Sequence, residues 1–310
     1  MKKIFELNNL NILDNIFWGK VNGPTYVYIE ITRKCNCKCE YCQISNMDNS
    51  DINLELYEEI LKQLRDLNCF EIRLGGGEPL LNAKLDEILQ LSEGFSIWLC
   101  TNGIMLTRDV CEMLKRHNVL GVRVSLDSLK PELHNKIRKN NYAFQNATKN
   151  MKLAKEFGLE VCLSMTIGHH NIDEVENMKQ FAKENGYKFL THFVMPVGNG
   201  EPFIKQKEIS EDKKISLLND ESGERNCVAG NQSFAIDTLG NVSACTFLKP
   251  VANIKEVDLK DIVDIKFDKY LKAIPNSKLC EKCEFKKTMK DEKCMACEIC
   301  RGGCWALYEK

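Results

Sequence analysis

Short apolar runs alternate along the chain with longer segments in which apolar residues recur every three or four positions. The short runs are rich in β-branched and aromatic residues, which predicts strands. They lie at 25–32, 71–74, 96–101, 121–126, 161–167 and 189–195. The longer amphipathic segments between them predict helices. Strands that alternate with helices of this length indicate a parallel sheet with right-handed crossovers.

Six strand–helix units fit between residue 25 and about residue 205. This number predicts an α/β fold of the partial (β/α)6 barrel type, with the active site at the carboxyl ends of the strands. Three motifs follow the first three strands: RKCNCKCEYC at 33–42, GGGEP at 75–79 and TNG at 101–103. We expect them to meet on one rim of the barrel.

The pattern changes after the sixth strand and predicts the domain organisation. We expect an N-terminal extension (1–24), the partial barrel (25–205), a connecting helix (206–226) and a small cysteine-rich domain (227–310). The segment SFAIDTLGNVSACTF begins the last domain and predicts a hairpin with Gly240 and Asn241 in its turn. The last thirty residues carry few large apolar side chains, so metal ligation would have to stabilise them.

Composition excludes several classes of protein. Hydrophobic residues make up 44% of the 310 residues and charged residues 28%, which are values of a globular protein. The net charge is -1 and basic residues are spread along the chain, so we expect no nucleic-acid partner. No apolar run approaches the roughly 20 residues of a membrane helix, and no secretory signal is apparent. We therefore expect a cytoplasmic protein without a membrane partner.

The chain contains sixteen cysteines, and cytosolic thiols stay reduced, so metal binding explains them better than a disulfide framework. Four lie in the motif at 33–42 and eight between Cys227 and Cys304. The other four occur singly in apolar or helical contexts, where a thiol packs as a small apolar group. These four are Cys69, Cys100, Cys111 and Cys162.

The first cysteine group contains two spacings. Cys35, Cys39 and Cys42 form CxxxCxxC, whereas Cys37 completes an alternating CxCxC. Three thiolates can bind three irons of a [4Fe-4S] cubane and leave the fourth iron open. Zinc is the competing ligand, but structural zinc usually takes two CxxC pairs, and no second pair lies nearby. We interpret Cys37 as a packing residue.

With these motifs the chain resembles the radical S-adenosylmethionine (SAM) superfamily. The signature CxxxCxxC falls after the first strand, with Tyr41 before its last cysteine, and the GGE motif of the family appears as Gly76, Gly77 and Glu78. The resemblance implies that Cys35, Cys39 and Cys42 bind a [4Fe-4S] cluster whose open iron is chelated by SAM. It also implies that the two glycines let the backbone approach the methionyl ammonium, while Glu78 supplies a complementary charge.

Further positions resemble SAM-contacting residues of the family. Tyr41 would pack near the adenine, and Ser125 and Arg138 would contact SAM. Asp127, two residues after Ser125, resembles a SAM-contacting position of the family as well. In the alternative interpretation Ser125 and Asp127 cap the next segment and Arg138 forms a surface ion pair. His169 and His170 follow the fifth strand, and we expect them to be exposed to solvent rather than catalytic. No catalytic residue is assigned.

The second cysteine group opens with Cys227, Gly240 and Cys245 and continues with CEKC (Cys280 and Cys283) and CRGGC (Cys300 and Cys304). With this pattern it resembles the SPASM domain, an auxiliary-cluster region that follows many radical SAM barrels. The cysteine spacing departs from the usual SPASM pattern in two ways: sixteen residues separate Cys283 from Cys300, and only six residues follow Cys304. The resemblance implies two auxiliary [4Fe-4S] clusters, and the alternative is a pair of zinc knuckles. The eight auxiliary ligands would be Cys227, Cys245, Cys280, Cys283, Cys294, Cys297, Cys300 and Cys304.

The resemblance implies that an electron donor such as flavodoxin or ferredoxin drives cleavage of SAM to a 5′-deoxyadenosyl radical, which removes hydrogen from a substrate carbon. We expect a peptide-modifying enzyme that performs crosslinking, epimerisation or oxidation. Formylglycine formation is disfavoured because Thr246 stands where those maturases carry an Asp. The 24 residues before the first strand are too few for a separate leader-binding domain. The alternatives are a dehydrogenase or epimerase of a small molecule such as an amino sugar, and a zinc-stabilised binding protein.

Overall fold

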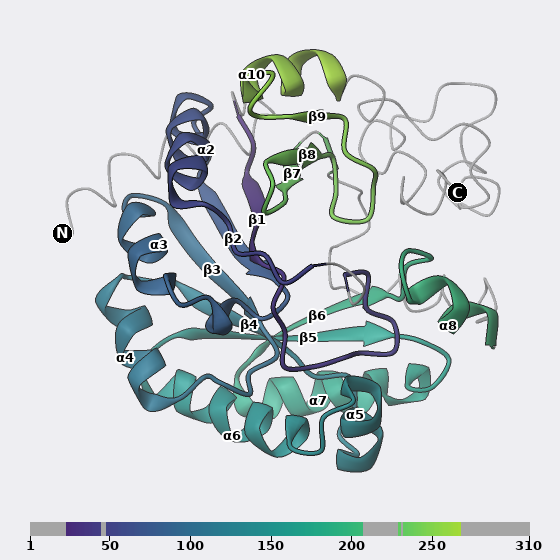
Figure 1. Cartoon of the computed structure of the whole chain (residues 1–310). Helices are drawn as coiled ribbons and strands as arrows, with labels where there is room; N and C mark the ends of the chain where they lie inside the picture. Colours follow the sequence, from purple (N-terminus) through teal and green to yellow (C-terminus); the bar gives the residue numbers. More distant parts are fainter. Residues whose placement is uncertain (1–22, 45–47, 207–228, 231, 268–310) are drawn as a thin grey trace, which may run out of the picture.

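The computed structural model describes residues 23–44, 48–206, 229, 230 and 232–267. Its centre is a curved sheet of nine strands in the order β6-β5-β4-β3-β2-β1-β7-β8-β9 (Figure 1). Each neighbouring pair from β1 to β6 is parallel. The bounds of these six strands are β1 Tyr26–Thr32, β2 Glu71–Gly76, β3 Ser96–Thr101, β4 Gly121–Ser125, β5 Glu160–Ile167 and β6 Lys188–Phe193. The expected α/β fold with six parallel strands is therefore confirmed.

Helices connect these strands and cover the outer side of the sheet (Figure 1). The α-helices are α2 Leu54–Asp66, α3 Leu85–Leu91, α4 Arg108–Arg116, α5 Pro131–Arg138, α6 Ala143–Glu156, α7 Val175–Asn185 and α8 Gly200–Gln206. Short 3-10 turns lie at η1 Pro79–Leu81 and η2 Ile172–Glu174. The start of α2 is typical: Asn53 accepts hydrogen bonds from the backbone N–H groups of Glu55 and Leu56.

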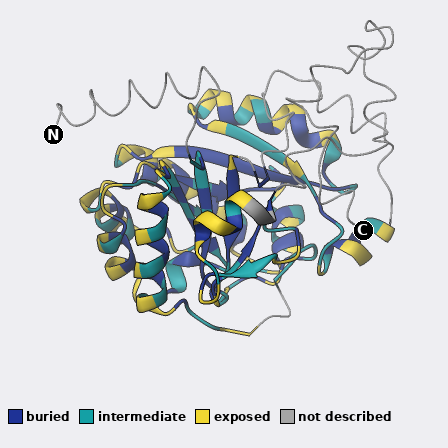
Figure 2. Cartoon of the chain, turned by 90° about the horizontal axis from the view of Figure 1, so that it is seen from above, coloured by how far each residue is buried: buried dark blue, intermediate teal, exposed yellow. Residues whose placement is uncertain are grey.

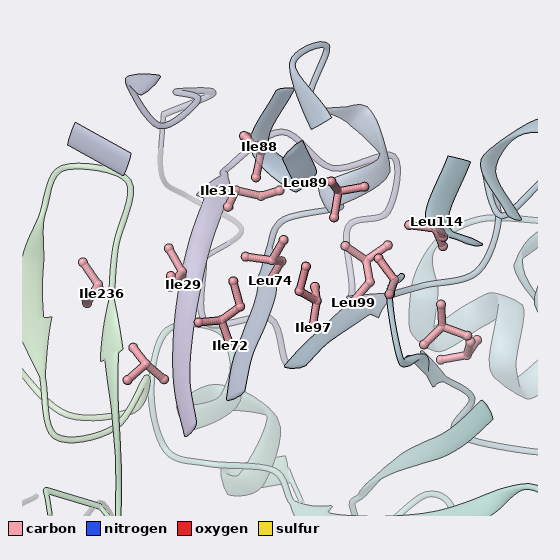
Figure 3. Close-up of a cluster of buried hydrophobic side chains, with 14 of the residues drawn as sticks. Ile29, Ile31, Ile72, Leu74, Ile88, Leu89, Ile97, Leu99, Leu114 and Ile236 are labelled. Carbon is pink, nitrogen blue, oxygen red and sulfur yellow. The ribbon is translucent and has the colours of Figure 1, made fainter. Parts of the chain in front are cut away.

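The hydrophobic core lies between the sheet and these helices. Alternate side chains of β1, β2 and β3 point toward α3, where Ile88 and Leu89 are buried (Figure 3). The outer faces of the helices remain exposed (Figure 2). Cys69, Cys111 and Cys162 are buried, as a packing role requires. Because the apolar side of each strand faces the helices, the side chains on its other side line the inner face of the curved sheet.

The segment after residue 228 extends the same sheet. Strand β7 (Ser233–Ile236) pairs in parallel with β1, and β8 (Asn241–Ser243) and β9 (Ala252–Asn253) follow antiparallel. The hairpin expected around Gly240 and Asn241 is confirmed, and Gly240 has a left-handed φ of 88°. A short helical segment, α10 (Leu259–Asp261) and η3 (Ile262–Lys266), ends the described part. The N-terminal extension, the connecting helix and most of the cysteine-rich domain lie outside the described residues.

Candidate active site

A cavity of about 340 Å³ lies at the carboxyl ends of the strands. This volume falls within the range of roughly 300–1,000 Å³ that small-molecule and cofactor sites occupy. Inward-facing side chains from five strands line it: Tyr28, Cys100, Ser125, Thr166 and His192. The other wall is the loop that follows β1. The predicted rim therefore borders this cavity.

The four thiols of the loop after β1 all border this cavity. Cys35 is exposed, Cys42 is half-buried, and Cys37 and Cys39 are buried. The backbone N–H of Cys37 donates to the Cys35 sulfur at 3.4 Å, and the N–H of Cys42 donates to the Cys39 carbonyl at 3.2 Å. These two bonds curl the loop so that its thiols gather on one side.

The donor set fits an iron–sulfur cluster better than a single metal ion. In the part of the chain that the structure describes, no three Cys, His, Asp or Glu side chains lie close enough together to hold one ion. A zinc ion needs its ligands to converge on a single point. A cubane binds each thiolate through a different iron atom, so several thiols that border one cavity suit it.

The thiols differ in their electrostatic surroundings. A hydrogen bond from Cys37 lowers the pKa of Cys39 to about 6, although burial acts in the opposite direction, and Arg138 lowers that pKa further. The same thiol of Cys37 lowers the pKa of Cys35. Burial raises the pKa of Cys42 to about 11. A thiolate is the form that ligates metal, so Cys39 is the thiol that the surrounding protein best prepares for ligation.

The GGGEP turn packs directly against the cysteine loop. The N–H of Gly77 donates to the carbonyl of Thr32, and the N–H of Glu78 donates to the carbonyl of Lys34, both at 2.7 Å. A Cβ at Gly77 would lie 2.8 Å from the carbonyl oxygen of Arg33. Gly76 has a φ of 125°, which favours glycine. The glycines therefore serve the contact between two backbones, besides any approach of a ligand.

Glu78 lies behind the cavity wall rather than on it. Its side chain is fully buried, and its oxygens accept hydrogen bonds from the Thr101 hydroxyl at 2.6 Å and from the N–H groups of Asn102 at 2.7 Å and Leu80 at 3.2 Å. Burial raises the pKa of this carboxyl to about 7. Glu78 thus joins the second and third motifs of the rim, and a direct contact with SAM stays a prediction.

Tyr41 and Arg138 meet on a buried carboxylate. The Tyr41 hydroxyl donates to Asp127 at 2.7 Å, and the Arg138 guanidinium lies 2.8 Å from the same oxygen. Asp127 is fully buried and Arg138 is only 7% exposed. The alternative of a surface ion pair for Arg138 is therefore wrong, because the pair is internal. The guanidinium and the Tyr41 ring both border the cavity.

His169 and His170 are not the solvent-exposed residues that we expected. Both are half-buried. His169 stacks on Phe203 of α8 with ring centroids 4.9 Å apart, and His170 meets the same ring edge-on at 4.9 Å. Phe203 also contacts Tyr41 at 6.1 Å. The chain segment after β6 thus reaches the cysteine loop, which local sequence patterns do not reveal.

The site contains residues that the sequence analysis missed. Cys100, expected in the core, instead lines the cavity from β3. Strict alternation along SIWLCT places Ile97 and Leu99 toward the helices and Cys100 on the opposite face, so the signal was present. Thr101 and Asn102 belong to the TNG motif that we expected on the same rim as GGGEP, and the structure shows that they meet it through hydrogen bonds to Glu78.

The hairpin of β7 and β8 closes a further side of the site. Arg33 of the cysteine loop bonds Glu30 at 2.6 Å and Asp237 of the hairpin at 3.1 Å. A second cavity of about 130 Å³ lies between the loop and the hairpin. Cys245 follows β8 and is half-buried. The other seven auxiliary cysteines, Cys227, Cys280, Cys283, Cys294, Cys297, Cys300 and Cys304, lie outside the described residues.

The structure thus gathers most of the predicted barrel-site residues around one cavity. Cys35, Cys39, Cys42, Tyr41, Gly76, Gly77, Ser125 and Arg138 line it, and Glu78 supports it from behind. Among the described residues, no helix is both long and apolar enough to cross a lipid bilayer.

Residues 29–182 match a family model described as the radical SAM superfamily. AlbA of Bacillus subtilis (strain 168), described as an antilisterial bacteriocin subtilosin biosynthesis protein, is 26% identical over 336 residues that cover 98% of this chain and 73% of AlbA. A GTP 3′,8-cyclase of Aquifex aeolicus (strain VF5) is 30% identical over 214 residues that cover 65% of this chain and 67% of the cyclase.

The fold is similar to a crystal structure of SuiB of Streptococcus suis bound to precursor peptide SuiA. The TM-score is 0.67, with 18% sequence identity, and the superposition covers 96% of this chain and 75% of SuiB. At that level of identity the likeness concerns the fold alone.

Proposed function

The chain belongs to the radical SAM superfamily and is an enzyme of that superfamily, and we propose that its substrate is a peptide. The superfamily binds SAM and a [4Fe-4S] cluster. When bound, these cofactors supply the radical chemistry that removes a hydrogen atom from an unactivated carbon. The remaining tasks, which are to bind, to orient and to exclude water, belong to the protein.

The residues of the cavity divide these tasks. Cys35, Cys39 and Cys42 would hold the cluster, since all three border the cavity. Ser125 at the end of β4 and Arg138 at the end of α5 offer polar contacts to SAM, since both border the cavity. The backbone at Gly76 and Gly77 forms one edge, and Glu78 adds its charge from behind that edge without giving up its three internal hydrogen bonds.

A peptide is favoured by the extent of one similarity. The likeness to AlbA, a bacteriocin biosynthesis protein, covers 98% of this chain and so runs past residue 182, where the family match ends. The part beyond the barrel carries the eight cysteines that we assign to two auxiliary [4Fe-4S] clusters. A peptide bound at the site would meet Phe247, which lines the main cavity from just beyond Cys245.

A small-molecule substrate is the second candidate. One observation favours it, namely the 30% identity to a GTP 3′,8-cyclase, whose name describes a nucleotide reaction. The cavity volume of about 340 Å³ suits either a small molecule or one or two residues of a peptide. The two candidates differ in which compound changes mass during turnover.

The test is an anaerobic assay with reconstituted enzyme, SAM, a chemical reductant and short synthetic peptides encoded beside the gene. We expect 5′-deoxyadenosine together with a mass change in one peptide, and neither product from the Cys39→Ala variant. GTP in place of the peptide tests the second candidate. Consumption of GTP with no change in any peptide would overturn the proposal.

We also propose an electron donor and a cellular compartment for the enzyme. A flavodoxin or ferredoxin would replace the chemical reductant in the cell, and the cytoplasm would keep the sixteen thiols reduced. The same assay with purified flavodoxin and its reductase tests the donor. Turnover with dithionite alone, and none with flavodoxin or ferredoxin, would argue against it.

A further inference from the structure

A buried carboxylate organises the wall of the cavity next to Cys39. Asp127 is completely buried. Its two oxygens accept hydrogen bonds from the Tyr41 hydroxyl at 2.7 Å, from the Arg138 guanidinium at 2.8 Å and from the Thr166 backbone N–H at 3.1 Å. A carboxylate so far from water is tolerated only when it is paired and hydrogen-bonded, and Asp127 satisfies both conditions.

Arg138 connects Asp127 to the cysteine loop by hydrogen bonds. Its second terminal nitrogen donates to the Cys39 sulfur at 3.6 Å. The backbone adds two more bonds, because the carbonyls of Ile137 and Arg138 accept from the N–H groups of Glu40 at 3.0 Å and Lys38 at 3.2 Å. The loop after β1 therefore rests on the end of α5, toward which it runs in Figure 1.

The charges of the pair remain on both groups. Burial alone would raise the pKa of Asp127, but Arg138 and the hydrogen bond from Tyr41 outweigh it, and the pKa lies below its usual value. The neighbouring His134 accepts a hydrogen bond from the Asp127 backbone N–H, and burial lowers the pKa of His134 to about 4, so this ring adds no charge near neutral pH. The guanidinium next to Cys39 is thus compensated by one carboxylate.

We propose that Asp127 is a positioning residue that holds Arg138 against the Cys39 thiolate and offsets its positive charge, so that the pair sets the electron affinity of the cluster which the three cysteines bind. This inference rests on the proposed function, since it concerns the cluster of that same site. Hydrogen bonds to cluster sulfurs and the charge near the cluster are known determinants of the reduction potential.

Replacing Asp127 and replacing Arg138 should change the reduction potential of the cluster in opposite directions. A positive charge beside the cluster stabilises its reduced state, which carries one more electron. Asp127→Asn removes a negative charge but keeps a side-chain oxygen that accepts from the guanidinium, so Arg138 stays beside Cys39 with its charge uncompensated and the reduction potential should rise. Arg138→Gln removes both the positive charge and the hydrogen bond to sulfur, so the potential should fall. Mere loss of packing has no reason to move the two variants in opposite directions.

The experiment is a redox titration of the reconstituted holoenzyme without SAM, followed by EPR of the reduced site cluster. We expect Asp127→Asn to shift the midpoint upward and Arg138→Gln to shift it downward. The double variant should return toward the wild-type value, because it removes a neutral pair. Asp86→Asn is the matched control: it makes the same change on an exposed carboxylate paired with Arg116 and should not shift the midpoint.

A second measurement needs no variant. Protein grown with ¹⁵N-labelled arginine should show a ¹⁵N coupling to the reduced cluster in pulsed EPR, and that coupling should be absent from the Arg138→Gln variant. Shifts in the same direction in both variants, or a wild-type spectrum without the coupling, would overturn the inference. If wild-type protein forms no cluster and cleaves no SAM, it is the proposed function that fails.

Discussion

Gly77 is a position where one added methyl group should strongly disturb the site. A Cβ there would lie 2.7 Å from the carbonyl carbon of Lys34 and 2.8 Å from the carbonyl oxygen of Arg33, and its shortest contact would be with the Lys34 oxygen. All three are backbone atoms of the cysteine loop, so no side chain can swing away. To restore ordinary contact the two backbones must separate by roughly 1 Å.

This separation has a calculable cost. Overpacking of a tight contact typically costs about 1–3 kcal/mol. The separation also weakens the two bonds of 2.7 Å between the turn and the loop, each worth about 1 kcal/mol. Gly77→Ala should therefore destabilise the contact by about 2–4 kcal/mol and move the cysteines from their productive positions. A shift of about 1 Å can cost on the order of a hundredfold in rate, so we expect SAM cleavage to fall roughly 10- to 100-fold.

The assay measures iron per chain and the rate of 5′-deoxyadenosine formation under anaerobic conditions. Gly94→Ala is the matched control, because Gly94 has a φ of 96° and open space around its Cβ position. An Ala at this positive φ costs about 1 kcal/mol, but the strain falls just before β3 and away from the cavity. We expect the control to keep its iron and activity. Full iron and an unchanged cleavage rate in Gly77→Ala would refute the steric reasoning.

Three further predictions concern other parts of the site. Cys37→Ala should keep its iron and most SAM cleavage whereas Cys39→Ala should lose cleavage, and equal loss in both would contradict the ligand assignment. Burial raises the pKa of Glu78 from 4.5 to about 7, so the unfolding free energy of the wild type should fall by about 3 kcal/mol as the pH rises through that window. Urea unfolding at a series of pH values should show that the unfolding free energy of Glu78→Gln depends less on pH. The same pH dependence in both proteins would count against the raised pKa. Arg33→Met should cost about 3–5 kcal/mol in urea unfolding, because it leaves the buried carboxylate of Glu30 unpaired; a loss below about 1 kcal/mol would show that this ion pair contributes little.

Local spacing explains why much of the site was predictable. The three cysteines of CxxxCxxC lie within one loop, so their proximity follows from the sequence itself. The six parallel strands were also predictable, because each has a long apolar run on the face that packs against helices. Ser125 and Arg138 were named from the resemblance, and both line the cavity, whereas their contact with SAM stays a prediction.

The contacts between distant segments were not predictable. Helix α5 begins at Pro131, is only 8 residues long and contains mostly polar residues, so the search for long amphipathic segments did not find it. The parallel pairing of β7 with β1 joins segments about 200 residues apart and leaves no local signal. Glu78 shows the consequence: its motif was recognised, but its hydrogen bonds to Thr101 and Asn102 depend on how the second and third turns meet.

The central claim is that Cys35, Cys39 and Cys42 together hold a [4Fe-4S] cluster. The most direct test is the iron content of anaerobically reconstituted protein, compared between wild type and a variant with all three cysteines changed to Ala. Three cubanes correspond to about twelve irons per chain, and the variant should retain about eight. Equal iron in both proteins, or zinc in place of iron in the wild type, would contradict the claim.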